Sequence, residues 1–268
     1  AAPGLYNVTL NASNPYGYNI STRTAYIDVG NPPAAGFTTN VTGGNAPQAV
    51  QFTDTTEHTP TSWNWTFGDG SFSEDQHPVH VYAAPGTYTV TLNASNPYGY
   101  DLSTQTDLVT VLAPPAASFT QNVTEGNAPL AVAFTDASTG NVTAWSWLFG
   151  DGQTSTLQNP AHTYAAAGTY TVTLNASNAY GYDISTQTDL ITVLTLPAAA
   201  FSANATVIPV GAAVQFTDAS TGDITGWSWT FGDGETSTTQ SPAHTYGAAG
   251  TYTVTLTVSN AYGGDTET

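Results

Sequence analysis

The 268-residue sequence contains no cysteine, no methionine and almost no positive charge. Without cysteine there can be no disulfide bond and no cysteine nucleophile, so each small domain must depend on its apolar core. The only basic residue is Arg23, against 19 acidic residues, and the net charge is -18 on a chain that is 7% charged. Because phosphate binding requires a basic surface, we expect no nucleic-acid partner and no anionic membrane partner.

Long apolar runs are missing as well. No stretch approaches the roughly 18 apolar residues of a membrane-spanning helix, and the start does not resemble a signal peptide. We therefore expect no membrane insertion within this segment, with any targeting or anchoring segment removed or lying outside it.

What the sequence does contain is repetition. A run of the type W-x-W-x-F-G-D-G appears three times, and its first glycine falls at Gly68, Gly150 and Gly232, a spacing of 82 residues from 68 to 150 and from 150 to 232. No insertion or deletion breaks the period. A fixed period, with each unit the size of a small domain, is typical of a tandem array.

The repeat boundaries follow from the same period. Residues 4–18 match residues 86–100, and the last unit ends before any match to the TDLVTVL run at 106–112. We therefore predict two whole repeats, a third that lacks its last strand, and an initial closing hairpin. These segments are 32–114, 115–196, 197–268 and 1–31, respectively.

Apolar residues inside each unit recur with period two. Tyr170, Val172, Leu174 and Ala176 alternate with Thr and Asn, which indicates a strand with one apolar face. Short strands separated by Gly, Pro, Asn and Asp at intervals of about ten residues are typical of a β-sandwich. No stretch has a 3.6-residue period, so we expect almost no helix.

The aspartate of each F-G-D-G run is the first candidate for chemistry. Asp69, Asp151 and Asp233 could be metal ligands or acids, or they could be turn residues between two glycines that adopt positive φ. We favour the turn, because no second acid or histidine stands at a fixed short spacing from the aspartate.

These motifs carry a resemblance to a known family. The W-x-W-x-F-G-D-G run, the H-T-Y at 162–164 and 244–246, and the following G-T-Y-T-V-T-L resemble the PKD (polycystic kidney disease) domain. The resemblance implies immunoglobulin-like sandwiches of about seven strands, and an extracellular spacer or adhesion role without catalysis or cofactor. Members occur in animal surface proteins, in bacterial proteases and chitinases, and in archaeal surface-layer proteins. The Lys-free composition looks most like the archaeal group.

Histidines are the next candidates. His80, His162 and His244 recur once per unit beside an aromatic residue, which favours packed rings with a bonded nitrogen over metal ligands. His58 and His77 occur only in the first unit, near acidic residues, and leave room for one local metal site. No D-x-D-x-D-G loop is present, so calcium could bind only through scattered aspartates and carbonyls. We assign no catalytic, cofactor or metal residue.

Asparagine sequons form a further group of candidate sites. Several fall on the polar face of a strand or where a strand meets a loop, where glycans would shield a surface with few charges. We predict that several carry N-linked glycans. The ten sequons begin at Asn7, Asn11, Asn19, Asn40, Asn64, Asn93, Asn122, Asn141, Asn175 and Asn204.

The sequence as a whole predicts an all-β chain of tandem immunoglobulin-like sandwiches in a rod-like array, with short proline-containing linkers. An unpartnered hairpin over 1–31 leaves two alternatives: a continuous longer array, which we favour, or donation of Thr22–Gly30 to the open edge of another copy. We expect a non-catalytic, glycosylated extracellular filament or cell-surface layer whose partners are other copies. The alternative is a spacer or adhesion region of a larger secreted hydrolase or adhesin.

Overall fold

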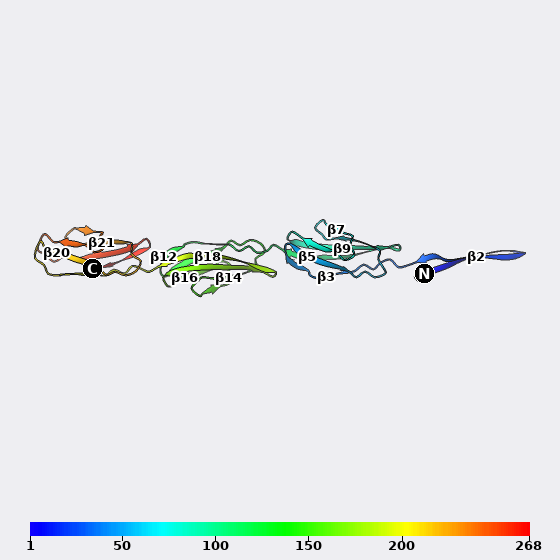
Figure 1. The fold of residues 1–268 in the computed structure, drawn as a ribbon, viewed down its shortest axis with the longest axis horizontal. Helices are drawn as coiled ribbons and strands as arrows, with labels where there is room; N and C mark the ends of the chain where they lie inside the picture. The colour runs from blue at the N-terminus through cyan, green and yellow to red at the C-terminus, as the bar shows by residue number, and fades with distance from the viewer. The chain divides into compact units, whose positions relative to one another are not determined.

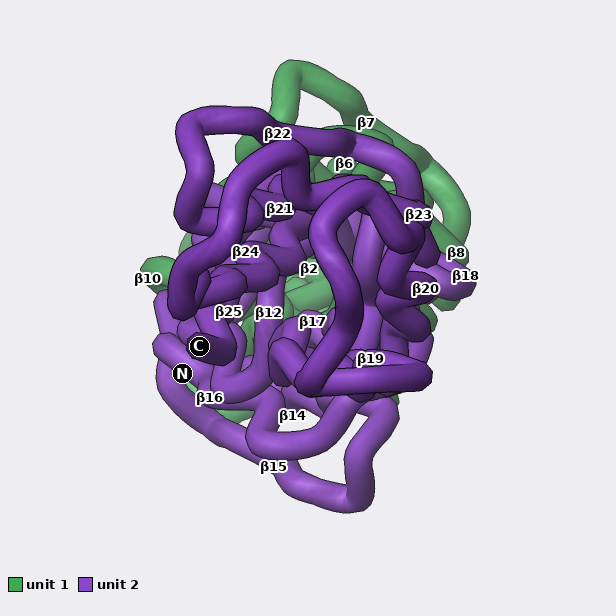
Figure 2. The backbone as a smooth tube through the Cα atoms, turned by 90° about the vertical axis from the view of Figure 1, so that its left-hand side faces the viewer, with its two compact units in different colours: residues 1–114, 178–181 green, residues 115–177, 182–268 purple.

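A computed structural model describes residues 1–268 and contains 25 strands and no helix (Figure 1). No helix is therefore available to cross a membrane. The prediction of an all-β chain is confirmed. The chain divides into two compact units, one of Ala1–Pro114 with Asn178–Gly181 and one of Pro115–Ser177 with Tyr182–Thr268 (Figure 2).

The first unit begins with a hairpin and continues into a sandwich. The hairpin strands β1 (Gly4–Asn14) and β2 (Gly17–Val29) pair antiparallel, and nearly all their side chains are exposed. The sandwich has a three-stranded sheet in the order β3-β5-β8 and a five-stranded sheet in the order β4-β10-β9-β6-β7. Its strands are β3 (Phe37–Thr39), β4 (Gly43–Asn45), β5 (Gln48–Asp54), β6 (Ser62–Thr66), β7 (Phe72–Ser73), β8 (Val79–Tyr82), β9 (Gly86–Asn96) and β10 (Gly99–Leu112).

The second unit holds two further sets of sheets. Their orders are β11-β13-β16 with β12-β18-β17-β14-β15, and β19-β20-β23 with β22-β21-β24-β25. The first set comprises β11 (Phe119–Gln121), β12 (Glu125–Asn127), β13 (Leu130–Asp136), β14 (Ala144–Leu148), β15 (Thr154–Ser155), β16 (Ala161–Tyr164), β17 (Gly168–Asn178) and β18 (Gly181–Leu194). The second comprises β19 (Phe201–Ala203), β20 (Ala213–Asp218), β21 (Gly226–Thr230), β22 (Thr236–Ser237), β23 (Ala243–Thr245), β24 (Thr255–Asn260) and β25 (Gly263–Glu267).

The expectation of about seven strands falls one short in the first two repeats, where eight strands are found. The additional elements are short. β4 and β12 have three residues each and pair parallel with the ends of β10 and β18. Their sequences, GGN and EGN, lack any alternating apolar pattern, so sequence periodicity could not reveal them.

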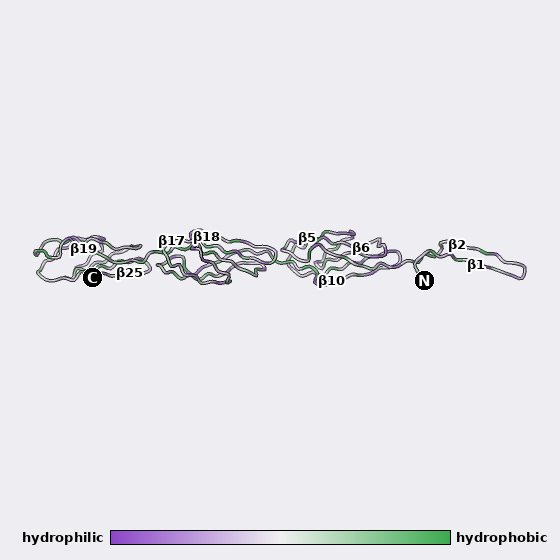
Figure 3. The backbone as a smooth tube through the Cα atoms, turned by 90° about the horizontal axis from the view of Figure 1, so that it is seen from below, coloured by the Kyte–Doolittle hydropathy of each residue, from purple (hydrophilic) through white to green (hydrophobic).

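The predicted alternation in β17 is confirmed by burial. Val172, Leu174 and Ala176 are completely buried, whereas Thr173 and Asn175 on the opposite face are half-buried. Figure 3 shows hydrophobic (green) and hydrophilic (purple) segments mixed within the sandwiches. Burying a valine or leucine side chain stabilises a fold by about 1.5–3 kcal/mol, so Val172 and Leu174 both contribute to the core of the sandwich.

A tryptophan stands at the centre of each core. Trp65, Trp147 and Trp229 each have 0% of their surface exposed. In the first repeat, the Trp65 ring packs edge-on against Phe37, with centroids 5.1 Å apart, and also contacts Phe52 at 5.7 Å. The same contacts recur in the other two repeats. These aromatic cores stabilise each sandwich, as disulfide bonds stabilise many small secreted domains.

Candidate functional site

The F-G-D-G run forms the tight turn that links β6 to β7, β14 to β15 and β21 to β22. Its two glycines both have positive φ, 88° at Gly150 and 89° at Gly152 in the second repeat. A Cβ at Gly150 would lie 2.6 Å from the carbonyl oxygen of Thr171, whereas a Cβ at Gly152 would meet nothing within 4 Å. The first glycine is therefore required by both conformation and space, and the second by conformation alone.

The aspartate between these glycines closes the turn. Asp151 Oδ1 accepts a hydrogen bond from the Gln153 amide at 3.0 Å, and Asp69 and Asp233 accept equivalent bonds from the amides of the residues two positions further on. This is an Asx turn, and the interpretation of these aspartates as turn residues agrees with the geometry.

The second carboxylate oxygen has a partner that sequence reasoning missed. Asp151 Oδ2 lies 2.8 Å from His162 Nε2, and the equivalent pairs in the first and third repeats are both separated by 2.7 Å. The histidine stands eleven residues after the aspartate in every repeat. A constant offset between the two residue types was the signal in the sequence that could have revealed the pair.

Aromatic rings hold the histidine on both sides. The His162 ring stacks on Phe149, with centroids 4.2 Å apart and an interplanar angle of 4°, and it meets Tyr164 edge-on at 4.6 Å. The Tyr164 hydroxyl donates a hydrogen bond to the Phe149 carbonyl at 3.0 Å. The expectation of a packed histidine with a bonded ring nitrogen matches this arrangement.

The environment of Asp151 stabilises its charged form. Burial by itself would raise the pKa of this carboxyl group, but the hydrogen bonds from the Gln153 amide and the His162 ring outweigh it and lower the pKa. The pKa of Asp69 is lowered by the same balance, with Ser71 and His80 as partners. The Asp–His pair resembles the orienting half of a catalytic triad, but the adjacent Tyr164 hydroxyl is bonded to the Phe149 carbonyl.

A second aspartate in each repeat was not singled out from sequence. Asp136 Oδ2 accepts hydrogen bonds from the Trp145 indole at 2.7 Å and the Gln158 amide at 3.0 Å. Burial tends to raise the pKa of Asp136, but bonds from Ser138, Gln158 and Trp145 lower it overall. Asp54 and Asp218 have the same partners in their own repeats. The sequence signal for this second aspartate was the F-T-D run that recurs in every repeat.

The histidines confined to the first repeat do not form a metal centre. His77 Nδ1 accepts the backbone amide of Asp54 at 3.1 Å, and the carbonyl of His58 accepts a bond from Asn96 Nδ2 at 2.9 Å. Nowhere in residues 1–268 do three His, Asp or Glu side chains gather as ligands for a metal ion. The local acidic residues near His58 and His77 are therefore surface groups rather than a coordination shell.

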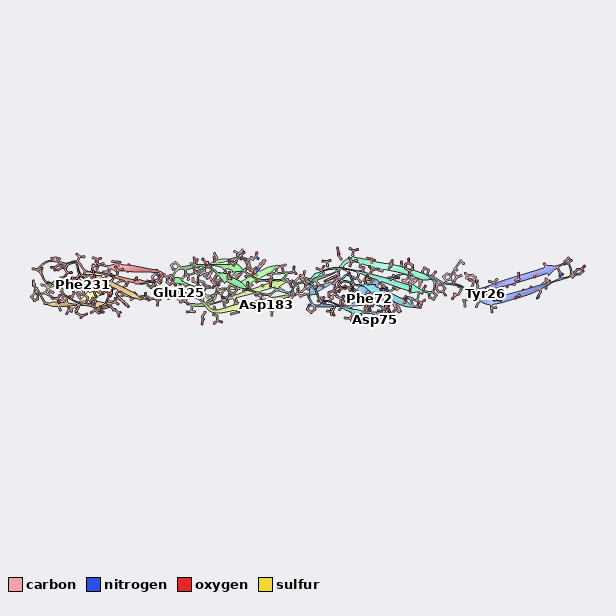
Figure 4. All side chains as sticks on the ribbon, turned by 90° about the horizontal axis from the view of Figure 1, so that it is seen from above. Tyr26, Phe72, Asp75, Glu125, Asp183 and Phe231 are labelled. Atoms are coloured by element: carbon pink, nitrogen blue, oxygen red, sulfur yellow. The ribbon has the colours of Figure 1, made fainter.

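Asparagines at the hairpin tips make a third recurring set of contacts. Within the second unit, Asn260 Nδ2 donates to Asn127 Oδ1 at 2.8 Å and to the Asp223 carbonyl at 3.0 Å. Within the first unit, Asn96 Nδ2 donates to the Asn31 carbonyl at 3.0 Å. An aspartate just beyond each tip, such as Asp183 (Figure 4), accepts a backbone amide from the proline-containing segment at the start of its repeat.

The sequon asparagines differ in exposure. Eight of the ten are exposed, whereas Asn93 and Asn175 are half-buried, and their Oδ1 atoms are enclosed without a hydrogen-bond partner. Asn40, Asn122 and Asn204 directly follow short strands, and the Oδ1 atom of each accepts a backbone amide at 2.8–2.9 Å. Their Nδ2 atoms, where a glycan would be attached, are not used in those bonds.

Comparison with known protein families agrees with these recurring features. The model of the PKD domain matches residues 30–111, 112–193 and 196–268. The chain belongs to the PKD domain family. The family resemblance read from the W-x-W-x-F-G-D-G motif is therefore confirmed.

PKD relatives at the sequence level are much longer proteins. The chain is 34% identical over 150 residues to human Polycystin-1, covering 45% of this chain and 3% of that protein. It is 31% identical over 182 residues to the pre-pro-metalloprotease PrtV of Vibrio cholerae, covering 62% and 19%. It is 44% identical over 54 residues to collagenase ColA of Bacillus cereus, covering 20% and 6%.

Solved structures support the fold. The I-band fragment I67-I69 from titin superimposes with a TM-score of 0.61 at 14% identity, covering 88% of this chain and 96% of the fragment. At that identity the likeness concerns fold alone. It confirms the prediction of tandem immunoglobulin-like sandwiches.

The two turn glycines provide a matched pair of variants. We expect Gly152→Ala to cost about 1–2 kcal/mol of unfolding free energy through the left-handed backbone alone. Gly150→Ala should cost about a further 1–3 kcal/mol because its methyl group overlaps the Thr171 carbonyl. Calorimetric unfolding of the two variants measures the difference. Equal destabilisation would contradict the steric role assigned to Gly150.

Acid should weaken the turns. A carboxyl group whose pKa is lowered by folding adds stability that is complete above its unfolded pKa and is lost as pH falls through the lower folded value, roughly between pH 5 and pH 1. Unfolding by urea across this range should therefore show a falling midpoint. The variant with Asp69, Asp151 and Asp233 all changed to Asn should start lower and fall less steeply. Parallel curves would show that these carboxylates make no pH-dependent contribution.

Proposed function

We propose that this chain is a non-catalytic structural array that forms a glycosylated extracellular filament or cell-surface layer by self-association. The observation that carries the proposal is the use of the recurring polar side chains. In each repeat, the turn aspartate bonds a backbone amide of the tight turn and the histidine ring. The second aspartate accepts a hydrogen bond from a tryptophan indole. Repeats of one design offer equivalent contacts along a chain, which a filament or lattice requires.

A second candidate function is that of a spacer in a larger secreted protein. It is favoured by the sizes and names of the relatives, since the matched part is 19% of a metalloprotease and 6% of a collagenase. In that setting the array would hold another domain away from a surface, and its own copies would not need to associate. The extracellular location proposed for both candidates is supported by these relatives and by the recurring sequons.

Sedimentation velocity separates the two candidates. Each copy carries a net charge of -18, so copies repel one another at low salt. If the array self-associates, its sedimentation coefficient should rise with concentration, and should rise further when salt is increased to about 0.5 M and the repulsion is screened. A single concentration-independent species in both salts would contradict self-association and favour the spacer.

Glycan occupancy should follow exposure. We expect peptides of the native protein that contain the sequons to weigh more than their bare amino-acid sequences. Peptide mapping with a protease other than trypsin should find higher occupancy at the exposed Asn64 and Asn204 than at the half-buried Asn93 and Asn175, where a modifying enzyme has less access. Bare peptide masses at all ten sequons would contradict the glycoprotein part of the proposal.

A further inference from the structure

One short segment of the first repeat differs in sequence from the matching segments of the other two repeats. Residues 72–81 read FSEDQHPVHV in the first repeat, whereas the second reads TSTLQNPAHT and the third TSTTQSPAHT. The second and third differ from each other at two of these positions, and the first differs from both at six. Because all three adopt the same strands here, each repeat serves as a reference for what the fold itself requires.

Positions that hold the fold are kept in this segment. His80 bonds the turn aspartate in the first repeat as its equivalents do elsewhere, and Gln76 bonds Asp54 in the same way. His77 also has an equivalent in the other repeats. Its ring accepts the Asp54 amide, just as the side chains of Asn159 and Ser241 accept the corresponding aspartate amides of the second and third repeats. The fold therefore explains the unchanged residues and His77.

The other changes add exposed apolar side chains. Phe72 is 72% exposed, Val79 63% and Val81 50%, where the other repeats have Thr, Ala and Thr. Val79 and Val81 alternate with the inward-facing His80 and Tyr82 on β8, so both point away from the core. Packing within the sandwich gives no reason for these residues.

These side chains lie on strands with a free edge. β8 pairs with β5 on one side only and is the outermost strand of its sheet, and β7 is the outermost strand of the other sheet. The two strands are joined by residues 74–78. Glu74 and Asp75 in this connection are exposed, and they are acidic where the second and third repeats have Thr-Leu and Thr-Thr; Figure 4 labels Phe72 and Asp75 on this part of the first repeat.

We propose that the free edge of β8 in the first repeat is a docking site for an extended, basic segment of another polypeptide. Unpaired backbone groups on an outer strand can accept an added strand, and outward valines offer contacts to alternate aliphatic side chains of that strand. Glu74 and Asp75 then face a lysine or arginine at the end of the segment. The partner is not a second copy of this chain, which carries one basic residue and a net charge of -18.

A titration followed by NMR tests the proposal. The probe is the capped synthetic peptide Lys-Thr-Val-Thr-Val-Thr-Lys, added to the full chain. We expect amide shifts confined to Val79–Tyr82 and the neighbouring connection. The triple variant Phe72→Thr, Val79→Ala, Val81→Thr takes the residues that the other repeats already tolerate, so it should fold and should bind about tenfold more weakly, equivalent to about 1.4 kcal/mol.

Two controls define the chemistry. The same peptide with Glu in place of Lys should not bind, and Glu74→Thr with Asp75→Thr should weaken binding and reduce its salt dependence. Transferring the edge to the second repeat by Thr154→Phe, Thr156→Glu, Leu157→Asp, Ala161→Val and Thr163→Val should create a second binding site, with shifts at residues 161–164.

Several results would overturn the proposal. These are no binding at millimolar peptide, equal binding by the triple variant, or equal binding of the Glu peptide. If instead the triple variant abolishes self-association of the chain alone in sedimentation, the edge belongs to an interface between copies, and the basic partner is excluded. Self-association that is unchanged by the triple variant leaves the docking edge independent of the proposed filament or layer.

Discussion

Each sandwich depends on a column of packed rings. In the second repeat, Trp147 lies parallel to Phe149 at 6.5 Å, His162 stacks on Phe149 at 4.2 Å, and Tyr164 meets His162 edge-on and stacks on Tyr170 at 4.5 Å. The column connects strands from both sheets. A chain without cysteine has no disulfide bond between its two sheets, so the contacts between these rings hold the sheets together. The turn aspartate then fixes the histidine ring of the column through its Nε2 atom.

Local patterns predicted much of this architecture. The alternation in Tyr170–Ala176 correctly gave the buried face of β17, and the glycines around Asp151 correctly gave a tight turn, because both depend on neighbours in sequence. The pairing of Asp151 with His162 could not be derived in that way. His162 lies on β16 of the three-stranded sheet, whereas Asp151 lies in the turn between two strands of the five-stranded sheet. Only the closure of the sandwich brings the two side chains to 2.8 Å. The contact between Trp145 and Asp136 was missed for the same reason.

The sequons, too, could be located from local sequence, whereas their exposure depends on tertiary structure. A sequon is a local motif, so all ten were found from sequence, but the difference between exposed Asn64 and half-buried Asn93 arises only when β6 and β9 lie side by side. Likewise, the differences in residues 72–81 can be read from the sequence, but only the structure places Val79 and Val81 on a strand with a free edge.

The account places function in repetition and surface rather than in a catalytic centre. Electron microscopy of the native material, with helical or lattice averaging, tests this claim most directly. The account predicts ordered fibres or sheets whose subunits are sandwiches of the kind described here, repeating at whole numbers of domains. Isolated chains ending in a distinct globular head would contradict it, and the function would then reside in that head.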